Sequence, residues 1–244
     1  MRFFYGFVFV TIDCNANSIK YKLNSSMKKW LMVFILVGFI AFFSYLVYLN
    51  QYVKKSFSDN QFTGKQVTQI EYQLEDYPRE LINMLLLVED QSFYDHWGID
   101  FKEIIRVVYG YIFEEKEIRG ASTITQQLIK NTLLTREKTF TRKIEEALMA
   151  VLLERSYNKN FILERYMNTV YLAQKGSIAF HGFAAASNYY FNKKVENLNL
   201  NEMAKLVALL KGPSYYNPFR YPERLNQRAE MILLMNRKYK KIVQ

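Results

Sequence analysis

Two carboxylates and several cations lie in this chain at spacings that could build one reactive site. Glu89 ends an apolar helical pattern, while Arg142 and Glu146 stand four residues apart in another, with Lys130 between the two segments. Alone, Arg142 and Glu146 would be a surface ion pair worth a few tenths of a kcal/mol. Together the four suit displacement of a phosphate leaving group at a sugar carbon. One carboxylate would take the proton of an attacking hydroxyl, and the cations would stabilise the departing pyrophosphate. A glycosidase instead needs a carboxylic acid that protonates the leaving oxygen.

The stretch 119–131 gathers glycine, hydroxyl, amide and lysine side chains. Thr123-x-x-Gln126 has the spacing of a capping box, which predicts that a helix begins here. The N–H groups of such a helix start favour an anion, and Lys130 would add positive charge two turns later. An ordinary polar helix start has the same pattern, so spacing alone leaves both interpretations open.

Helical periodicity dominates the chain from Pro78 onward, and we expect a mainly α fold. Leu81, Met84, Leu85 and Val88 follow the i, i+3, i+4, i+7 spacing of one helix face. We find no pattern that predicts a strand hairpin, and we expect a loop over 114–120. Further helices are expected over 100–113, from 122, over 141–156, 159–172, 201–210 and 222–240.

An uncharged run from Trp30 to Leu49 precedes this region. Its twenty residues would span about 30 Å as a helix, the thickness of a bilayer core. Lys28 and Lys29 favour a cytoplasmic N-terminus, and without a small-residue cleavage site we interpret the run as an uncleaved anchor. The expected organisation is a cytoplasmic segment 1–29, a transmembrane anchor 30–49, a linker 50–77 and a folded domain 78–244. We also hypothesise that translation begins at Met27, so that residues 1–26 are not made.

Composition restricts the function classes. The 244 residues carry a formal charge of +10, which favours an anionic partner such as nucleic acid, phosphates or a membrane surface, without choosing among them. Cys14 is the single cysteine and His96 and His181 are the two histidines, which argues against a disulfide framework and a metal site. We expect no cofactor, although Mg²⁺ bridged by a carboxylate would be compatible with these residues.

Five segments, taken in order, resemble the signature motifs of the peptidoglycan glycosyltransferases, and in particular the glycosyltransferase module of class A penicillin-binding proteins. Any one of them would be weak evidence, whereas all five in order are highly specific. The segments are Glu89-Asp90-x-x-Phe93-x-x-His96-x-Gly98, Gly120-x-Ser122-Thr123-Ile124-Thr125-Gln126-Gln127-x-x-Lys130-Asn131, Arg142-Lys143-x-x-Glu146, Lys159-x-x-Ile162-Leu163-Glu164-x-Tyr166-Met167-Asn168-x-x-Tyr171 and Lys211-Gly212-Pro213-Ser214-x-Tyr216-Asn217-Pro218.

The resemblance implies a lysozyme-like helical fold that polymerises lipid II into β-1,4-linked glycan strands and releases undecaprenyl pyrophosphate. Glu89 would be the general base. Glu146 would assist, either by orienting Arg142 or by shaping the acceptor site. Lys130, Arg142 and Lys211 would hold phosphate groups. Asp90 would be either a helper near the substrate or a solvated or capping carboxylate. The donor cleft would be lined by Ser122, Thr123, Gln126, Gln127 and Asn131. The chain ends about 25 residues after the last motif, so we expect a monofunctional member of the family.

Two positions depart from the family pattern. Ala173 and Asn192 stand where glycine is usual, and strain at Ala173 would slow the enzyme if that position needs a positive φ angle. Asn tolerates such an angle better than most residues.

The expected location is the bacterial cytoplasmic membrane, with a single span and the catalytic domain on the outer side. Expected partners are lipid II, the growing strand, membrane lipids and other cell-wall synthases, with no nucleic acid. The main alternative is a catalytically weak scaffold that binds lipid II. A glycan-cleaving enzyme is disfavoured by the cations and the anchor, and a nucleic-acid binder by the external domain.

Overall fold

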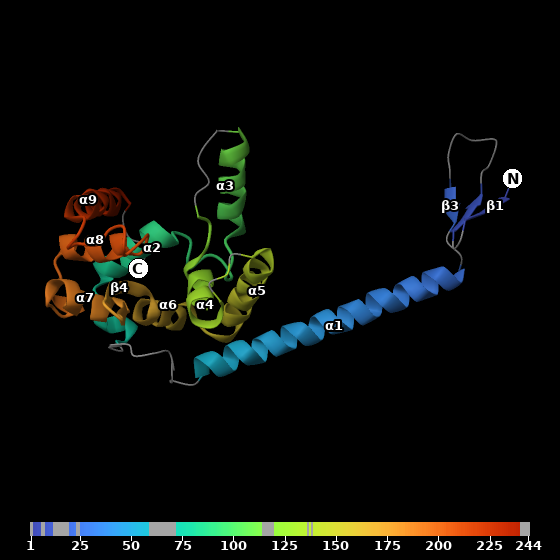
Figure 1. The fold of residues 1–244 in the computed structure, drawn as a ribbon, viewed down its shortest axis with the longest axis horizontal. Helices are drawn as coiled ribbons and strands as arrows, with labels where there is room; N and C mark the ends of the chain where they lie inside the picture. Colours follow the sequence, from blue (N-terminus) through green and yellow to red (C-terminus); the bar gives the residue numbers. More distant parts are fainter. Residues whose placement is uncertain are drawn as a thin grey trace. The chain divides into compact units, whose positions relative to one another are not determined.

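A computed structural model describes residues 2–5, 8–11, 20–22, 25–58, 72–113, 120–135, 137 and 139–239. The chain divides into two compact units, Met1–Leu49 and Asn50–Gln244, and each unit is described here by itself. Helices dominate the described residues (Figure 1), which confirms the mainly α fold class expected from the sequence.

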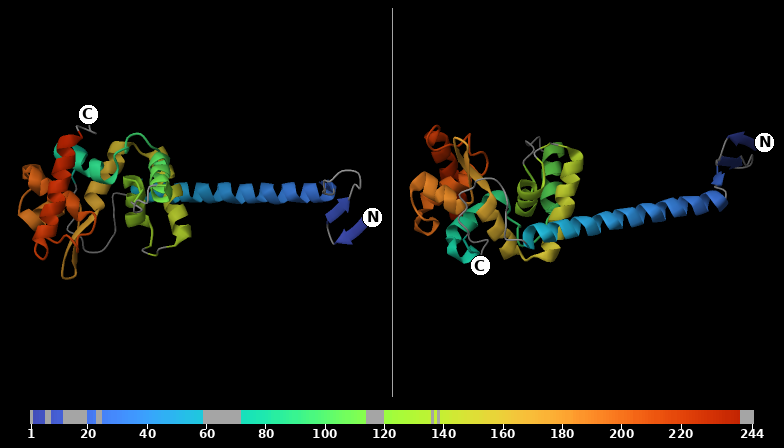
Figure 2. Two further views of the ribbon diagram at one scale, coloured as in Figure 1. Left: turned by 90° about the horizontal axis from the view of Figure 1, so that it is seen from above. Right: turned by 60° about the horizontal axis from the view of Figure 1, so that its bottom comes forward.

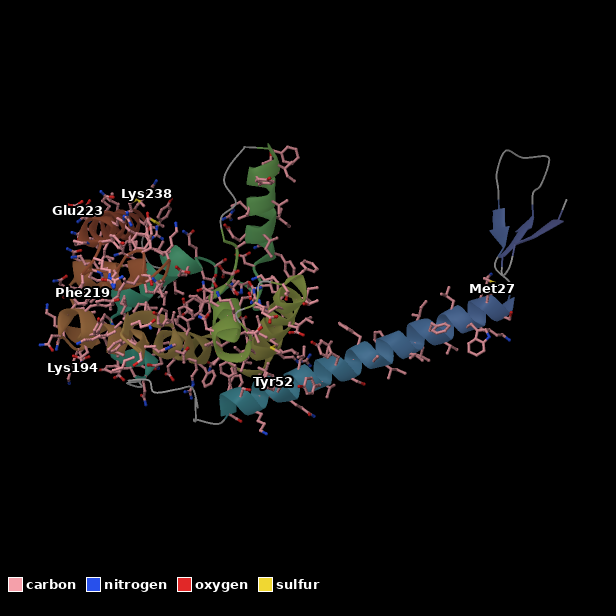
Figure 3. All side chains as sticks on the ribbon, in the orientation of Figure 1. Met27, Tyr52, Lys194, Phe219, Glu223 and Lys238 are labelled. Atoms are coloured by element: carbon pink, nitrogen blue, oxygen red, sulfur yellow. The ribbon has the colours of Figure 1, made fainter. Side chains whose placement is uncertain are left out.

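The first unit contains a small antiparallel sheet and most of a long helix. Strands β1 (Arg2–Tyr5), β2 (Val8–Thr11) and β3 (Lys20–Lys22) pair in that order. Helix α1 (Ser25–Ser58) is long and apolar enough to cross a membrane by length and composition. Figure 3 shows its side chains projecting above and below the ribbon, and the apolar residues from Trp30 to Phe43 are exposed. A helix exposed and apolar all round is typical of a membrane span.

The second unit is built mainly from helices, which Figure 2 shows from two further directions. Its elements are a 3-10 helix (Leu74–Asp76), α2 (Arg79–Glu89), α3 (Phe101–Phe113), α4 (Ile124–Leu133), α5 (Phe140–Ser156), α6 (Lys159–Thr169), β4 (Tyr171–Lys175), β5 (Ile178–His181), α7 (Phe183–Phe191), a second 3-10 helix (Val195–Asn197), α8 (Leu200–Leu209) and α9 (Pro222–Lys238).

Two groups of packed helices form the core of this unit. Helix α2 buries the apolar face predicted from its spacing, including Leu81, Met84 and Leu85, and packs against α8 and α9. Helix α4 buries Ile124 and Leu128 and packs against α5 and α6. Buried apolar contacts therefore fix both the end of α2 and the start of α4. The first motif begins at the end of α2, and the second motif includes the start of α4.

The expectation of no strand hairpin was wrong, because β4 and β5 form one. The helix expected over 159–172 ends at Thr169, where Val170 takes an extended conformation. Gly176 has a φ angle of +59° between the two strands, a conformation that favours glycine in a tight turn. The strands are short and their register is irregular between Tyr171 and Ala173. The alternation of apolar and polar residues that predicts a strand is therefore not recognisable in the sequence.

Two further segments differ from the expectation. Helix α7 was not predicted, and it begins after Gly182, whose φ angle is +83°. Helix α1 continues to Ser58, into the expected linker 50–77, because Val53 and Phe57 are buried there. The Phe57 ring lies 6.3 Å from that of Tyr157 in the same unit. Of the loop expected over 114–120, residues 114–119 lie outside the described residues.

Candidate active site

Glu89 is the last residue of α2 and its side chain is half-buried. One carboxylate oxygen, Oε2, accepts a hydrogen bond from Nε2 of Gln127 on α4 at 2.8 Å. The other oxygen, Oε1, has no hydrogen-bond partner within the part of the chain that the structure describes. The carboxylate is thus held by one oxygen while the second is available to accept a proton.

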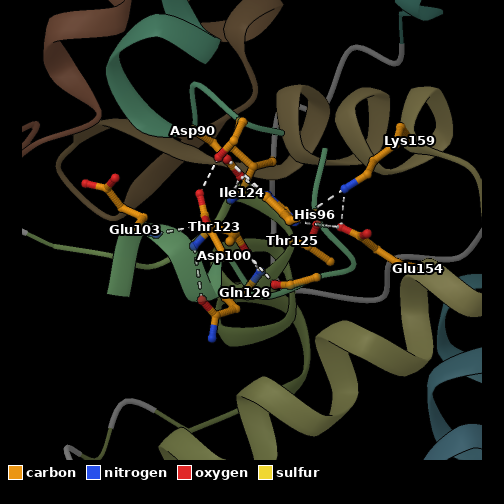
Figure 4. A network of polar contacts seen from close by, with 12 residues as sticks. Asp90, His96, Asp100, Glu103, Thr123, Ile124, Thr125, Gln126, Glu154 and Lys159 are labelled. Carbon is orange, nitrogen blue, oxygen red and sulfur yellow. Dashed lines mark hydrogen bonds and ion pairs between the residues drawn. The ribbon is translucent and has the colours of Figure 1, made fainter. Parts of the chain in front are cut away.

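Asp90, the next residue, is buried and fixed on two sides. Its carboxylate accepts the backbone N–H of Ile124 at 2.9 Å, and His96 Nε2 lies 3.0 Å from its Oδ1 (Figure 4). The Asp90 carboxylate therefore occupies the N-terminus of α4, where a negative charge is favoured. The helix start predicted to attract an anion already holds one from within the chain. The role of Asp90 near the substrate stays a prediction.

The buried network continues from His96 to α5 and α6. His96 Nδ1 lies 3.5 Å from Nζ of Lys159, which forms an ion pair of 2.7 Å with Glu154. Thr125 of α4 donates its hydroxyl to the same Glu154 at 2.6 Å. Burial lowers the pKa of Lys159, while the Glu154 carboxylate acts in the opposite direction. These contacts join the first two motifs to the helices beneath them.

The capping box predicted from Thr123 and Gln126 is confirmed. Thr123 Oγ1 accepts the N–H of Gln126, and the Gln126 side chain accepts the N–H of Thr123, both at 3.1 Å. The Thr123 hydroxyl also donates to the carbonyl of Gly98 at 2.7 Å. Both side chains are buried and used within the fold, so contact of either with a substrate stays a prediction.

Glu146 is almost fully buried, with 1% of its surface exposed, yet it is surrounded by cations. Arg142 Nη1 donates to its Oε2 at 2.9 Å, and Lys143 Nζ contacts its Oε1. The Lys143 ammonium also donates to Ser122 Oγ at 2.8 Å. The cluster carries a net positive charge, and the buried Nε of Arg142 has no hydrogen-bond partner among the described residues. This arrangement suits an anion, and the ion pair holds the Arg142 guanidinium against Glu146. Whether Glu146 serves to orient Arg142 or to shape the acceptor site stays a prediction.

The remaining predicted residues lie on the surface. Lys130 and Asn131 are exposed on α4, and Lys211 is exposed after α8. In the described part of the chain, neither lysine has an ion-pair partner. A lysine without a partner can bind a phosphate without breaking an existing salt bridge.

A pocket of about 540 Å³ lies apart from the residues that the sequence singled out as catalytic. Its walls come from β4, α7 and the segment after α8, and they combine aromatic faces with amide and cationic groups. Such a lining suits a sugar ring, which can stack on aromatic side chains and hydrogen-bond to amides. The aromatic residues are Tyr171, Tyr189, Tyr190 and Phe219, and the polar ones include Gln174, Lys175, Ser214, Asn217 and Arg220.

Helix α3 carries an apolar surface that faces away from the core. Ile105, Ile112 and Phe113 are each at least 60% exposed, and Gly110 is its one buried residue. Phe140, at the start of α5, is 80% exposed. An exposed apolar surface of this kind marks contact with a partner or a membrane.

Comparison with known proteins identifies the family. The model of the transglycosylase family matches residues 55–236, and the chain belongs to this family, whose domain is a lysozyme-like helical fold. Penicillin-binding protein 1B of Haemophilus influenzae is 44% identical over 169 residues, which are 69% of this chain and 22% of that protein. Penicillin-binding protein 1A of Neisseria lactamica is 48% identical over 158 residues, 65% of this chain and 19% of the relative.

Penicillin-binding protein 1B of Escherichia coli K12 is 44% identical over 157 residues, 64% of this chain and 19% of that protein. The chain thus spans about a fifth of the length of these curated relatives.

Two contacts and one pocket were not predicted from the sequence. Lys143 was quoted within a motif but given no role, although its i, i+3 spacing to Glu146 could have indicated the contact. Tyr166 was also quoted without a role, and its hydroxyl reaches Gln127. The aromatic pocket had no local signal, because its walls come from segments separated along the chain.

Proposed function

We propose that this chain is a peptidoglycan glycosyltransferase that polymerises lipid II into β-1,4-linked glycan strands and releases undecaprenyl pyrophosphate. The observation that carries the proposal is the arrangement of Glu89, held by Gln127 with one oxygen available, in a fold that also groups Arg142 and Lys143 around Glu146. Membership of the transglycosylase family and the similarity to penicillin-binding proteins 1A and 1B support it.

In the proposed reaction, Glu89 acts as the general base. Its Oε1 takes the proton of the 4-hydroxyl of the acceptor sugar, and the resulting oxygen attacks the anomeric carbon of the donor strand. The bond from that carbon to the pyrophosphate breaks, and the leaving group departs with the electron pair. The displacement inverts the α-linkage of the donor to the β-linkage of the product.

Cations take the place of the acid that a glycosidase needs, because pyrophosphate leaves as an anion. Lys130 and Arg142 would bind the donor pyrophosphate, with Lys211 near a lipid phosphate. Lys143 adds a charge beside Arg142, and Glu146 keeps both side chains in place. The donor cleft would be completed by Ser122, Thr123, Gln126, Gln127 and Asn131.

A lipid-linked substrate requires the enzyme to work at a membrane. Helix α1 meets the length and composition of a span, and the lysines at positions 28 and 29 favour a cytoplasmic N-terminus. The exposed apolar surface of α3 suits contact with a membrane interface. We therefore place the catalytic domain at the outer face of the bacterial cytoplasmic membrane, where other cell-wall synthases would be neighbours.

The direct test is polymerisation of purified lipid II by the detergent-solubilised full chain, read as glycan bands on a gel. The bands should disappear on digestion with a muramidase, which cleaves β-1,4 links. Parallel reactions with Mg²⁺ and with EDTA would examine the expectation that no cofactor is needed. A folded protein that binds lipid II without polymerising it would contradict the proposal and favour the scaffold.

A further inference from the structure

Tyr166 of α6 lies beneath Gln127 and is almost completely buried, with 1% of its surface exposed. Its hydroxyl is 3.1 Å from Gln127 Oε1, and the Nε2 of the same amide is 2.8 Å from Glu89 Oε2. Three side chains from α6, α4 and α2 therefore form one chain of hydrogen bonds. It ends at the carboxylate assigned above as the base.

The direction of each hydrogen bond in this chain follows from the chemistry of its members. An ionised carboxylate only accepts hydrogen bonds, so Gln127 must turn its NH₂ group toward Glu89. The amide oxygen then faces Tyr166, whose hydroxyl must donate. With the amide reversed, its oxygen would face the carboxylate and two acceptors would oppose each other.

The Tyr166 hydroxyl is suited to remain a donor. Burial raises the pKa of Tyr166 well above its ordinary value, and the negative charges of Glu89 and Asp90 act in the same direction. The phenol therefore keeps its proton throughout the neutral range. Its single O–H has no competing acceptor among the described residues, so it is directed to Gln127.

We propose that Tyr166 is a positioning residue that orients Gln127, and through Gln127 the carboxylate of Glu89. Oε2 is engaged by the amide, and Oε1 is the atom left to receive the proton of the acceptor hydroxyl. This inference rests on the proposed function. During the step the acceptor O–H bond breaks and its proton moves to Oε1, while the oxygen forms its bond to the anomeric carbon. Oε2 continues to accept from Gln127 afterwards, so the same orientation serves both charge states of Glu89.

Tyr166→Phe tests the proposal by removing the hydroxyl and keeping the ring. Losing one hydrogen bond that orients the base should lower kcat for lipid II polymerisation about tenfold, with KM for lipid II unchanged. Tyr77→Phe is the matched control, because the Tyr77 hydroxyl is also buried and donates to Asn168 at 2.8 Å. Both variants should lose similar thermal stability, but Tyr77→Phe should keep the wild-type kcat.

A double-mutant cycle with Gln127→Met separates positioning from general loosening of the fold. If Tyr166 acts through Gln127, Tyr166→Phe should lower kcat no further once the amide is absent. Wild-type kcat in Tyr166→Phe, or an equal loss in both backgrounds, would overturn the proposal. If wild-type protein polymerises lipid II, such a result refutes only the positioning role. If wild-type protein makes no polymer, the proposed function and this inference both fail.

Discussion

The Asp90 carboxylate accepts the backbone N–H of Ile124 at 2.9 Å, and this bond joins the end of α2 to the start of α4. The two residues are 34 positions apart, so the contact exists only in the folded chain. It places Glu89, the neighbour of Asp90, beside the helix that carries Gln127. The contact explains how two motifs that are distant in sequence come to share one site.

Removing the Asp90 carboxylate should destabilise the domain. In Asp90→Ala the N–H of Ile124 and the ring of His96 lose a buried partner, which should cost about 3 kcal/mol of unfolding free energy. Thermal and chemical unfolding in detergent would measure the loss. Asp95→Ala removes an exposed carboxylate nearby and should leave the stability within about 0.5 kcal/mol of wild type. Equal stability of the two variants would contradict a structural role for Asp90.

Lys130→Ala and Arg142→Ala should both impair polymerisation but differ in stability. Lys130 is exposed and, among the described residues, lacks an ion-pair partner, so its removal should change the unfolding free energy by less than about 0.5 kcal/mol. Arg142→Ala takes a partner from the buried Glu146 and should cost about 2 kcal/mol. Lipid II turnover and unfolding, measured on the same preparations, would show the contrast.

The control for this pair is Arg79→Ala, which removes an exposed cation at the start of α2 and should alter neither property. If all three variants lost activity equally, general loss of positive charge would explain the effect and a specific phosphate site would not.

Gly98 should not tolerate a side chain. A Cβ atom there would lie 2.7 Å from the backbone carbonyl of Ala150, and the φ angle of +83° strains any L-residue. Gly98→Ala should therefore cost at least about 2 kcal/mol of unfolding free energy. Gly120→Ala is the control, since its Cβ would meet no atom of the described residues within 4 Å. A Gly98→Ala protein that melts at the Gly120→Ala temperature would show that α5 does not pack here.

The two departures from the family pattern should behave oppositely when glycine is restored. Asn192 has a φ angle of +53° at the end of α7, and it is the one residue other than glycine with a positive φ angle among those described. Asn192→Gly should thus be neutral or stabilising by about 0.5 kcal/mol, and Asn192→Ala should cost about 1 kcal/mol.

Ala173 has no positive φ angle and is buried in β4. The backbone strain that a positive φ angle would cause at this position is therefore absent. Ala173→Gly should destabilise the domain by about 0.5–1 kcal/mol. Melting temperatures of Asn192→Gly, Asn192→Ala and Ala173→Gly would check the predictions for both positions. An Ala173→Gly protein more stable than wild type would contradict the prediction for Ala173.

Local signals explain what the sequence could predict. The apolar spacing from Leu81 to Val88 and the capping box of Thr123 and Gln126 depend on neighbours within one helix, and both are confirmed. The hydrogen bonds of Tyr166 with Gln127 and of Asp90 with Ile124 depend on how separate helices pack. The spacing of apolar residues along one helix does not predict contacts between two helices. In the contact with Asp90, moreover, the donor is a backbone N–H, which the residue type does not reveal.

The hairpin and the extension of α1 differ from the sequence-based expectation for two separate reasons. The β4–β5 hairpin is short and its register shifts after Tyr171, so alternation did not reveal it. The burial of Val53 and Phe57 extends α1 through residues whose polar composition favoured a linker. In α1, tertiary packing thus outweighed the local pattern.

The most direct test of the central claim compares wild type with Glu89→Gln in lipid II polymerisation, at matched folding and lipid II binding. Glutamine keeps the shape of Glu89 and can still contact Gln127, but it cannot take a proton at neutral pH. The account predicts glycan polymer from wild type and a rate at least about a hundredfold lower from Glu89→Gln. Polymerisation by Glu89→Gln at close to the wild-type rate would contradict the assignment of Glu89 as the general base.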